Sequence, residues 1–241
     1  MSAFRPVLSH VTLKGVALLL ALFLVSCEPA EQKGQVETSS HGIEMWEGYT
    51  PHMRNHVSGR LDELAKFPVM GGGVLFLGDS LTEFMDLEGL FPDTPTGNFG
   101  IAGDTTDGVL TRLEQVTRHR PDRLILLIGT NDYGFGFSNQ HILDNIADIT
   151  DTITAEMPDT QVYVLSLLPR GLDAVADFAE INSALARRAE AGGYIYVDVR
   201  EGLADAAGML KPALTMDGLH LNAQGYGVLA DAIRPYVTGA D

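Results

Sequence analysis

Short apolar runs that alternate with segments of helical spacing constrain the fold of this chain more than any other feature. The run 123–128 is apolar almost throughout, which is typical of a strand covered on both faces. In the segment 138–157, isoleucines recur every three or four positions, as on the buried side of a helix. This alternation predicts a parallel sheet between two layers of helices, a three-layer α/β/α architecture. The predicted strands are 74–77, 98–101, 123–128, 161–167 and 194–199, and the predicted helices are 51–67, 81–90, 105–118, 138–157, 173–191 and 222–237.

The first 26 residues have the pattern of a secretory signal peptide and are not expected to join the fold. Arg5 and Lys14 are basic, and the apolar run 15–25 is too short to span a bilayer comfortably. Its end, Leu-Val-Ser before Cys27, resembles the lipobox of bacterial lipoproteins. The resemblance implies cleavage before Cys27 and attachment of lipid, including palmitate, to this residue. The alternatives are an ordinary signal peptide with an incidental cysteine, or an uncleaved anchor.

The remaining chain divides into a polar segment, 27–43, and one domain, 44–241. The polar segment carries almost no apolar residues and is expected to be a flexible tether. We therefore expect an exported protein that faces the periplasm and is held to a bacterial membrane through its lipid alone. The sequence does not indicate an oligomeric state.

Charge and cysteine content exclude several classes of partner. The chain has 32 acidic and 16 basic residues, and its formal net charge is −16. Nucleic acids and anionic lipid surfaces repel such a chain, so neither is an expected partner. Cys27 is the only cysteine, which leaves none for a disulfide or a thiolate metal site.

Polar residues follow several of the predicted strands directly. Ser80 follows the first strand, Gly103 the second and Asn131 the third, and Asp217 and His220 lie between the fifth strand and the last helix. In an open parallel sheet the ligand crevice lies beyond the carboxyl ends of the strands. These residues are therefore expected to meet at one edge of the sheet.

The residue types that meet there are those of acyl transfer. Ser80 supplies a hydroxyl nucleophile, His220 a base, and Asp217 a carboxylate that orients the imidazole. Asp198 is a competing acid, but Asp217 lies three residues before His220, on the same side of one turn. Ser80 also fits a capping box with Glu83, a role that is partly compatible with catalysis.

An ester-cleaving site also needs hydrogen-bond donors for the oxyanion that forms. The side chain of Asn131 and the backbone N–H groups of Gly103 and Ser80 are the candidates, although Asn-Asp after a strand is most often only a turn. The segment 134–137 is expected either to line the site or to be a mobile loop. The apolar residues expected to form the substrate pocket are Phe84, Phe135, Phe137, Leu167, Leu168 and Leu219.

Four blocks of this chain resemble, in order, those of the SGNH or GDSL-type hydrolases. They are Gly78-Asp79-Ser80-Leu81, Asn98-Phe99-Gly100-Ile101-Ala102-Gly103-Asp104-Thr105, Gly129-Thr130-Asn131-Asp132 and Asp217-Gly218-Leu219-His220. The branch most similar to this chain is that of the platelet-activating-factor acetylhydrolases. The resemblance implies the roles given above for the nucleophile, acid, base and oxyanion donors, a flavodoxin-like sheet of order 2-1-3-4-5, and no metal or other cofactor.

The expected function is hydrolysis of short-chain, acetyl-like carboxylic esters by a serine esterase, through an acyl-enzyme. A second possibility is a carbohydrate O-deacetylase acting on acylated glycans. A third, from another class, is a non-catalytic surface lipoprotein that binds acylated sugars. The intact set of nucleophile, base and acid argues against the third, because binding alone needs none of them.

Overall fold

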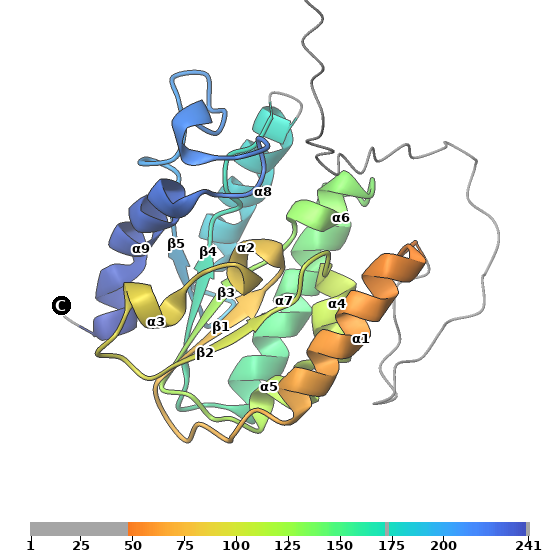
Figure 1. Cartoon of the computed structure of the whole chain (residues 1–241), viewed down its shortest axis with the longest axis vertical. Helices are drawn as coiled ribbons and strands as arrows, with labels where there is room; N and C mark the ends of the chain where they lie inside the picture. The colour runs from red at the N-terminus through yellow and green to blue at the C-terminus, as the bar shows by residue number, and fades with distance from the viewer. Residues whose placement is uncertain (1–47, 172–173, 240–241) are drawn as a thin grey trace, which may run out of the picture. The chain divides into compact units, whose positions relative to one another are not determined.

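The computed structural model describes residues 48–171 and 174–239, and these contain a five-stranded parallel sheet (Figure 1). The strand order, β2-β1-β3-β4-β5, confirms the predicted order 2-1-3-4-5. Every neighbouring pair is parallel, so all carboxyl ends lie at one edge. The strands are β1 (Val74–Gly78), β2 (Thr96–Gly100), β3 (Arg123–Leu127), β4 (Gln161–Leu165) and β5 (Ile195–Val197).

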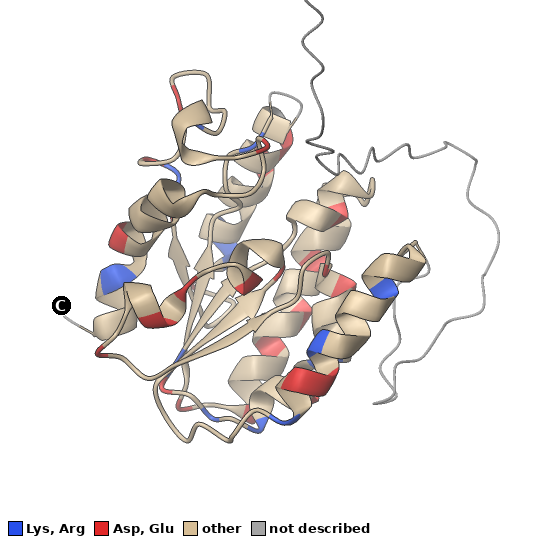
Figure 2. Ribbon diagram, viewed as in Figure 1, with Lys and Arg blue, Asp and Glu red and all other residues tan. Residues whose placement is uncertain are grey.

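The predicted signal peptide 1–26, the lipidated Cys27 and the tether 27–43 lie outside the described residues. Among the residues that are described, no helix combines the length and apolarity needed to cross a bilayer. Aspartate and glutamate residues are spread over helices on both sides of the sheet rather than gathered at one place (Figure 2).

Two hydrophobic cores form because successive strand residues point to opposite faces of the sheet. Leu75 and Leu77 of β1 belong to one core, whereas Val74 and Phe76 belong to the other. The first core packs against α1 (Pro51–Ala65), α4 (Thr106–Thr111), α5 (Leu113–Thr117), α7 (Asn139–Glu156) and α8 (Val175–Arg188). The second packs against α2 (Ser80–Glu83), α3 (Leu87–Leu90), the 3-10 turn η2 (Pro212–Leu214) and α9 (Ala223–Thr238).

The predicted helix 105–118 is interrupted at Arg112, which divides it into α4 and α5. The Arg112 side chain is buried, its Nε donates to Asp104 Oδ2 at 2.8 Å, and its Nη2 donates to the carbonyl oxygens of Gly78 and Phe99. The backbone at Arg112 leaves helical geometry (φ −116°, ψ 12°). The ion pair between Arg112 and Asp104 therefore breaks a helix that the apolar spacing of 105–118 predicts to be continuous.

The predicted helix 81–90 is likewise two short helices, α2 and α3. Asn98 of β2 donates its side-chain amide to the carbonyl oxygens of Thr82, Glu83 and Met85, where an unbroken helix would use its own N–H groups. Asp86 then caps α3 by accepting from the Gly89 N–H. One further short helix, α6 (Thr130–Gly134), lies where the sequence indicates only a turn or loop.

Candidate active site

Ser80 lies on a tight corner between the end of β1 and the start of α2. A Cβ at Gly78 would collide with the carbonyl oxygen of Leu127 and with Thr82 Oγ1, so only glycine allows this approach. Asp79 caps α2 by accepting from the Leu81 N–H at 2.9 Å. The capping box considered for Ser80 and Glu83 does not form, and the Ser80 hydroxyl is left for another partner.

That partner is His220, from a segment 140 residues further along the chain. Ser80 Oγ lies 3.0 Å from His220 Nε2, and His220 Nδ1 lies 2.6 Å from Asp217 Oδ2. An ionised carboxylate only accepts hydrogen bonds, so Nδ1 carries a proton and Nε2 is free to accept from the Ser80 hydroxyl. The predicted serine, imidazole and carboxylate thus form one chain of hydrogen bonds.

The loop before α9 holds Asp217 in place through its backbone. Asp217 Oδ1 accepts from the N–H groups of Leu219 and His220, and Oδ2 accepts from the imidazole. Partial burial alone would raise the pKa of Asp217, but these hydrogen bonds outweigh burial and hold it below its usual range. Asp198 instead forms a two-pronged ion pair with Arg200, so the competing acid is engaged elsewhere.

Two of the three predicted oxyanion donors, Gly103 and Asn131, lie on segments that contact each other. Gly103 follows β2 with φ +85°, and a Cβ there would approach Met53 Cε of α1 to 2.9 Å. Asn131, at the start of α6, donates one amide hydrogen to the carbonyl oxygen of Asp104 at 2.8 Å. A primary amide has a second hydrogen to offer. The described turns, loops and caps contain many backbone hydrogen bonds, but none of these has the N–H of Ser80 or Gly103 as its donor.

Three buried charged residues close to the Ser80 corner, Asp79, Asp104 and Arg112, were not predicted from the sequence to have a role there. Asp79 and Asp104 are both buried, and Arg112 forms an ion pair with Asp104. Asp79 Oδ2 has no partner among the described residues, and burial raises the pKa of Asp79 to about 8. The sequence did hold a signal, because Arg112 stands on the helical face of Val109 and Val116, where an arginine is out of place unless it is paired.

The predicted pocket residues are dispersed. Phe84 is 52% exposed, and its ring centroid lies 5.6 Å from that of His220, next to Ser80. Leu219 is half-buried on the His220 loop. Phe135 packs edge-on against Tyr49, and Phe137 stacks on His141.

Leu167 and Leu168 are both buried, in opposite cores. Leu167 borders a cavity of about 440 Å³ between α8 and the segment after β5, and Leu168 does not line that cavity. Polar side chains on that cavity are Arg170, Asp198, Arg200 and Glu201. Arg170 donates to the carbonyl oxygen of Thr130, so the cavity adjoins the residue before Asn131.

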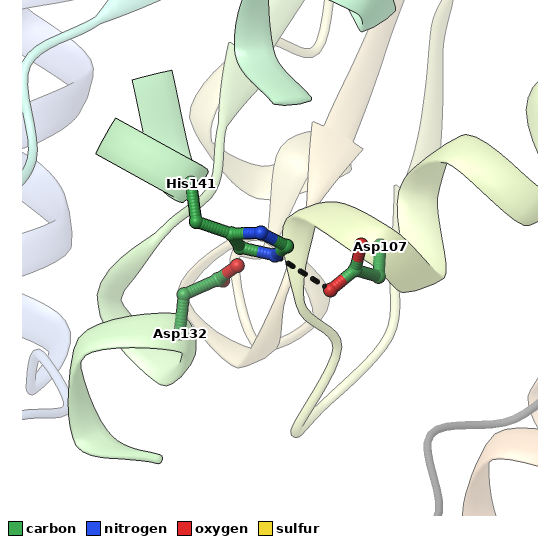
Figure 3. A group of neighbouring side chains, drawn as sticks. All are labelled: Asp107, Asp132 and His141. Carbon is green, nitrogen blue, oxygen red and sulfur yellow. Dashed lines mark hydrogen bonds and ion pairs between the residues drawn. The ribbon is translucent and has the colours of Figure 1, made fainter. Parts of the chain in front are cut away.

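One cluster near the oxyanion loops has the residue types of a metal site. Ligand atoms of Asp107, Asp132 and His141 all lie within 4.8 Å of one another (Figure 3). Protein hydrogen bonds already account for these positions: His141 Nε2 contacts Asp107 at 2.8 Å, and Asp132 accepts from Thr106. Burial raises the pKa of Asp132 to about 6, although hydrogen bonds from Thr106 oppose the shift.

The family model that matches this chain is the GDSL-like lipase/acylhydrolase family, over residues 76–228. The human platelet-activating factor acetylhydrolase IB subunit alpha1 is 31% identical over 171 residues, covering 67% of this chain and 73% of that protein.

Two solved structures illustrate the likeness in three dimensions. One, from Streptococcus pneumoniae and assigned as a platelet activating factor, is 30% identical with a TM-score of 0.68, covering 77% of this chain and 94% of the other. A variant of a Geobacillus acetyl-xylooligosaccharide esterase is 20% identical with a TM-score of 0.55, covering 68% and 94%, a likeness of fold alone.

The matched region contains the serine corner, both oxyanion loops and the Asp217–His220 loop. The sheet order, the hydrogen-bonded serine and histidine and the family match agree with one another. This chain therefore belongs to the GDSL-like lipase/acylhydrolase family and is a hydrolase of ester bonds.

Proposed function

We propose that this protein is a serine esterase that removes short, acetyl-like acyl groups through an acyl-enzyme intermediate. The observation that carries the proposal is the 3.0 Å contact between Ser80 Oγ and His220 Nε2, with Asp217 behind the imidazole. This distance lies within the range needed for direct proton transfer.

In the first half-reaction, Ser80 Oγ bonds to the ester carbonyl carbon while its proton passes to His220 Nε2. The negative charge that develops on the carbonyl oxygen is stabilised by the N–H groups of Ser80 and Gly103 and by the Asn131 amide. The bond to the alcohol oxygen then breaks, and the imidazolium returns its proton to the leaving alcohol. Asp217 keeps the ring in the required tautomer and stabilises its positive charge.

In the second half-reaction, His220 takes a proton from water as the water oxygen attacks the acyl carbon. The same donors stabilise the second oxyanion, and the bond to Ser80 Oγ breaks as that oxygen regains its proton. The carboxylic acid leaves, and the enzyme returns to its starting state. The ester and one water molecule are the only reactants needed to balance the two half-reactions.

Two observations support a short acyl group. Ser80 is only 4% exposed, so little space at its hydroxyl is open to a bulky acyl group. Relatives by sequence and by fold carry acetylhydrolase or acetyl-xylooligosaccharide esterase in their names. The second candidate, a carbohydrate O-deacetylase, is favoured by the cavity beside Thr130, whose charged side chains could hydrogen-bond sugar hydroxyls.

Turnover of para-nitrophenyl esters is expected to fall steeply beyond an acyl length of about six to eight carbons. The full-length protein in detergent is assayed on a series from acetyl to dodecanoyl, with acetylated xylo-oligosaccharides and an acetylated phospholipid in parallel. Preference for the oligosaccharide would select the deacetylase. Equal or faster turnover of long-chain esters would contradict the short-chain proposal.

We also propose that Cys27 carries lipid and holds the domain at a bacterial membrane, facing the periplasm. The basic residues, apolar run and lipobox-like sequence before Cys27 support this proposal. An anchored esterase would act on glycans or lipids close to that membrane, with no nucleic-acid partner, since the net charge is −16.

Cys27→Ser is expected to move the protein from the membrane pellet to the soluble fraction of the producing bacterium. The same change should abolish incorporation of radiolabelled palmitate. The wild-type chain and a Ser26→Ala variant, which keeps the cysteine, are the controls. A Cys27→Ser protein that still carries palmitate and sediments with membranes would rule out lipidation at this residue.

A further inference from the structure

The loop 102–106, which presents the Gly103 N–H, is held at both ends by carboxylates. Glu83 Oε2 accepts from the Ala102 N–H at 2.5 Å. At the other end, Asp132 accepts from the Thr106 N–H at 3.1 Å and from the Thr106 hydroxyl at 2.5 Å. Neither carboxylate belongs to the predicted catalytic set.

Neighbouring side chains support the Glu83 carboxylate at one end of the loop and Thr106 at the other. The oxygen of Glu83 that binds Ala102 also lies 3.0 Å from His56 Nε2 of α1. At the far end, the Asn145 amide donates to the Thr106 hydroxyl oxygen and to Asp107, while His141 contacts Asp107 (Figure 3). Two helices far apart in sequence, α1 and α7, thus support the two ends of one loop.

The loop 102–106 also orients the second oxyanion donor, the side-chain amide of Asn131. Asn131 donates one amide hydrogen to the Asp104 carbonyl oxygen, in the middle of the loop. Asp132, the residue after Asn131, binds Thr106 at the end of the loop. Any shift of the loop therefore moves the Gly103 N–H and changes the direction of the Asn131 amide together.

We propose that Glu83 and Asp132 are positioning residues that fix the Gly103 and Asn131 donors as one rigid oxyanion unit. This inference rests on the proposed esterase mechanism, in which those donors stabilise the transition state. Fixed donors act on the charge that develops during reaction, and misplacement by about 1 Å can cost about 100-fold in rate. The expected signature is a loss in kcat with little change in KM, because the unit acts mainly on the transition state.

Glu83 is the residue to change first, because its side chain is 15% exposed and water can replace it without leaving a dry cavity. Glu83→Ala is expected to lower kcat on para-nitrophenyl acetate by about 10- to 100-fold with KM within about twofold. Glu83→Gln retains an oxygen that accepts from Ala102 and should stay within about threefold of wild type. Glu88→Ala, at an exposed acid on neighbouring α3, is the matched control and should leave kcat unchanged.

The other end of the loop is tested by Thr106→Val, which removes the hydroxyl bound to Asp132 and keeps the shape of the side chain. We expect kcat to fall about 3- to 10-fold, whereas Thr111→Val, at an exposed threonine of α4, should have no effect. Combining Glu83→Ala with Asn131→Ala should cost less than the product of the two single losses, since the first change already misdirects the Asn131 amide.

Melting temperatures and the rate of fluorophosphonate labelling are measured for every variant. If the wild type neither hydrolyses esters nor reacts with the probe, the proposed function fails. If the wild type is active but Glu83→Ala and Thr106→Val match their controls, or raise KM instead of lowering kcat, the proposed positioning role of Glu83 and Asp132 is overturned. In the contrary case, a chelator lowers the wild-type kcat, with recovery when Zn²⁺ is added and no such recovery in Asp107→Asn. That result would make Asp107, Asp132 and His141 a metal site and would overturn the positioning role of Asp132.

Discussion

Replacing Ser80 with alanine is expected to lower kcat for para-nitrophenyl acetate by at least about 10⁴-fold. The change removes the oxygen that forms the acyl-enzyme in the proposed mechanism, and the residual rate is what binding and the oxyanion donors alone provide. Labelling by a fluorophosphonate probe, seen as a covalent mass increase on the wild-type protein, should disappear. The rate, the labelling and the melting temperature are measured on the same preparations.

The fold should survive this substitution, which makes the loss of activity interpretable. Asp79, not Ser80, caps α2, and alanine is a good residue for the first turn of a helix. The melting temperature should therefore stay within a few degrees of wild type. Ser183→Ala, on the exposed side of α8, is the matched control and should retain full activity and labelling. Stoichiometric labelling of the Ser80→Ala protein would place the nucleophile elsewhere.

Arg112→Met is expected to lower the free energy of unfolding by about 3–5 kcal/mol, the usual cost of removing one partner of a buried ion pair. The change leaves Asp104 buried without its counter-charge and deprives the carbonyl oxygens of Gly78 and Phe99 of a donor. For a domain of this size the loss corresponds to a fall in melting temperature of about 10 °C. Urea unfolding and thermal melts measure it directly.

Two comparisons separate this effect from the general cost of losing an arginine. Arg187→Met, at an exposed position of α8, should change stability by no more than about 0.5 kcal/mol. Burial raises the pKa of Asp104 above its usual range, so the deficit of Arg112→Met should shrink as the pH is lowered through that raised pKa, because a protonated Asp104 no longer needs a counter-charge. A deficit equal to that of Arg187→Met, or one that does not change with pH, would contradict the assigned role of the ion pair.

The sheet and the meeting of Ser80, His220 and Asp217 could be predicted because each depends on local pattern plus one topological rule. Apolar runs such as 123–128 mark strands covered on both faces, and parallel strands bring Ser80, Asn131 and His220 to a common edge. Asp217 could be preferred over Asp198 from spacing alone, and the structure places it against the imidazole. These inferences require no knowledge of side-chain packing.

What could not be predicted depends on contacts between distant residues. The break between α4 and α5 arises because Arg112 turns inward to Asp104, and that between α2 and α3 because Asn98 captures carbonyl oxygens. The capping pattern at Ser80 and Glu83 was misleading for the same reason. Glu83 binds Ala102, a residue of another loop, and Asp79 takes over the cap.

The contact between Ser80 and His220 joins residues near opposite ends of the described domain, and the Tyr226 hydroxyl of α9 reinforces it by donating to the Leu81 carbonyl oxygen. The chain is synthesised from its amino end, so Ser80 is made long before His220. In the proposed mechanism, a product that stops before His220 lacks the base that activates Ser80, and it is expected to have no esterase activity.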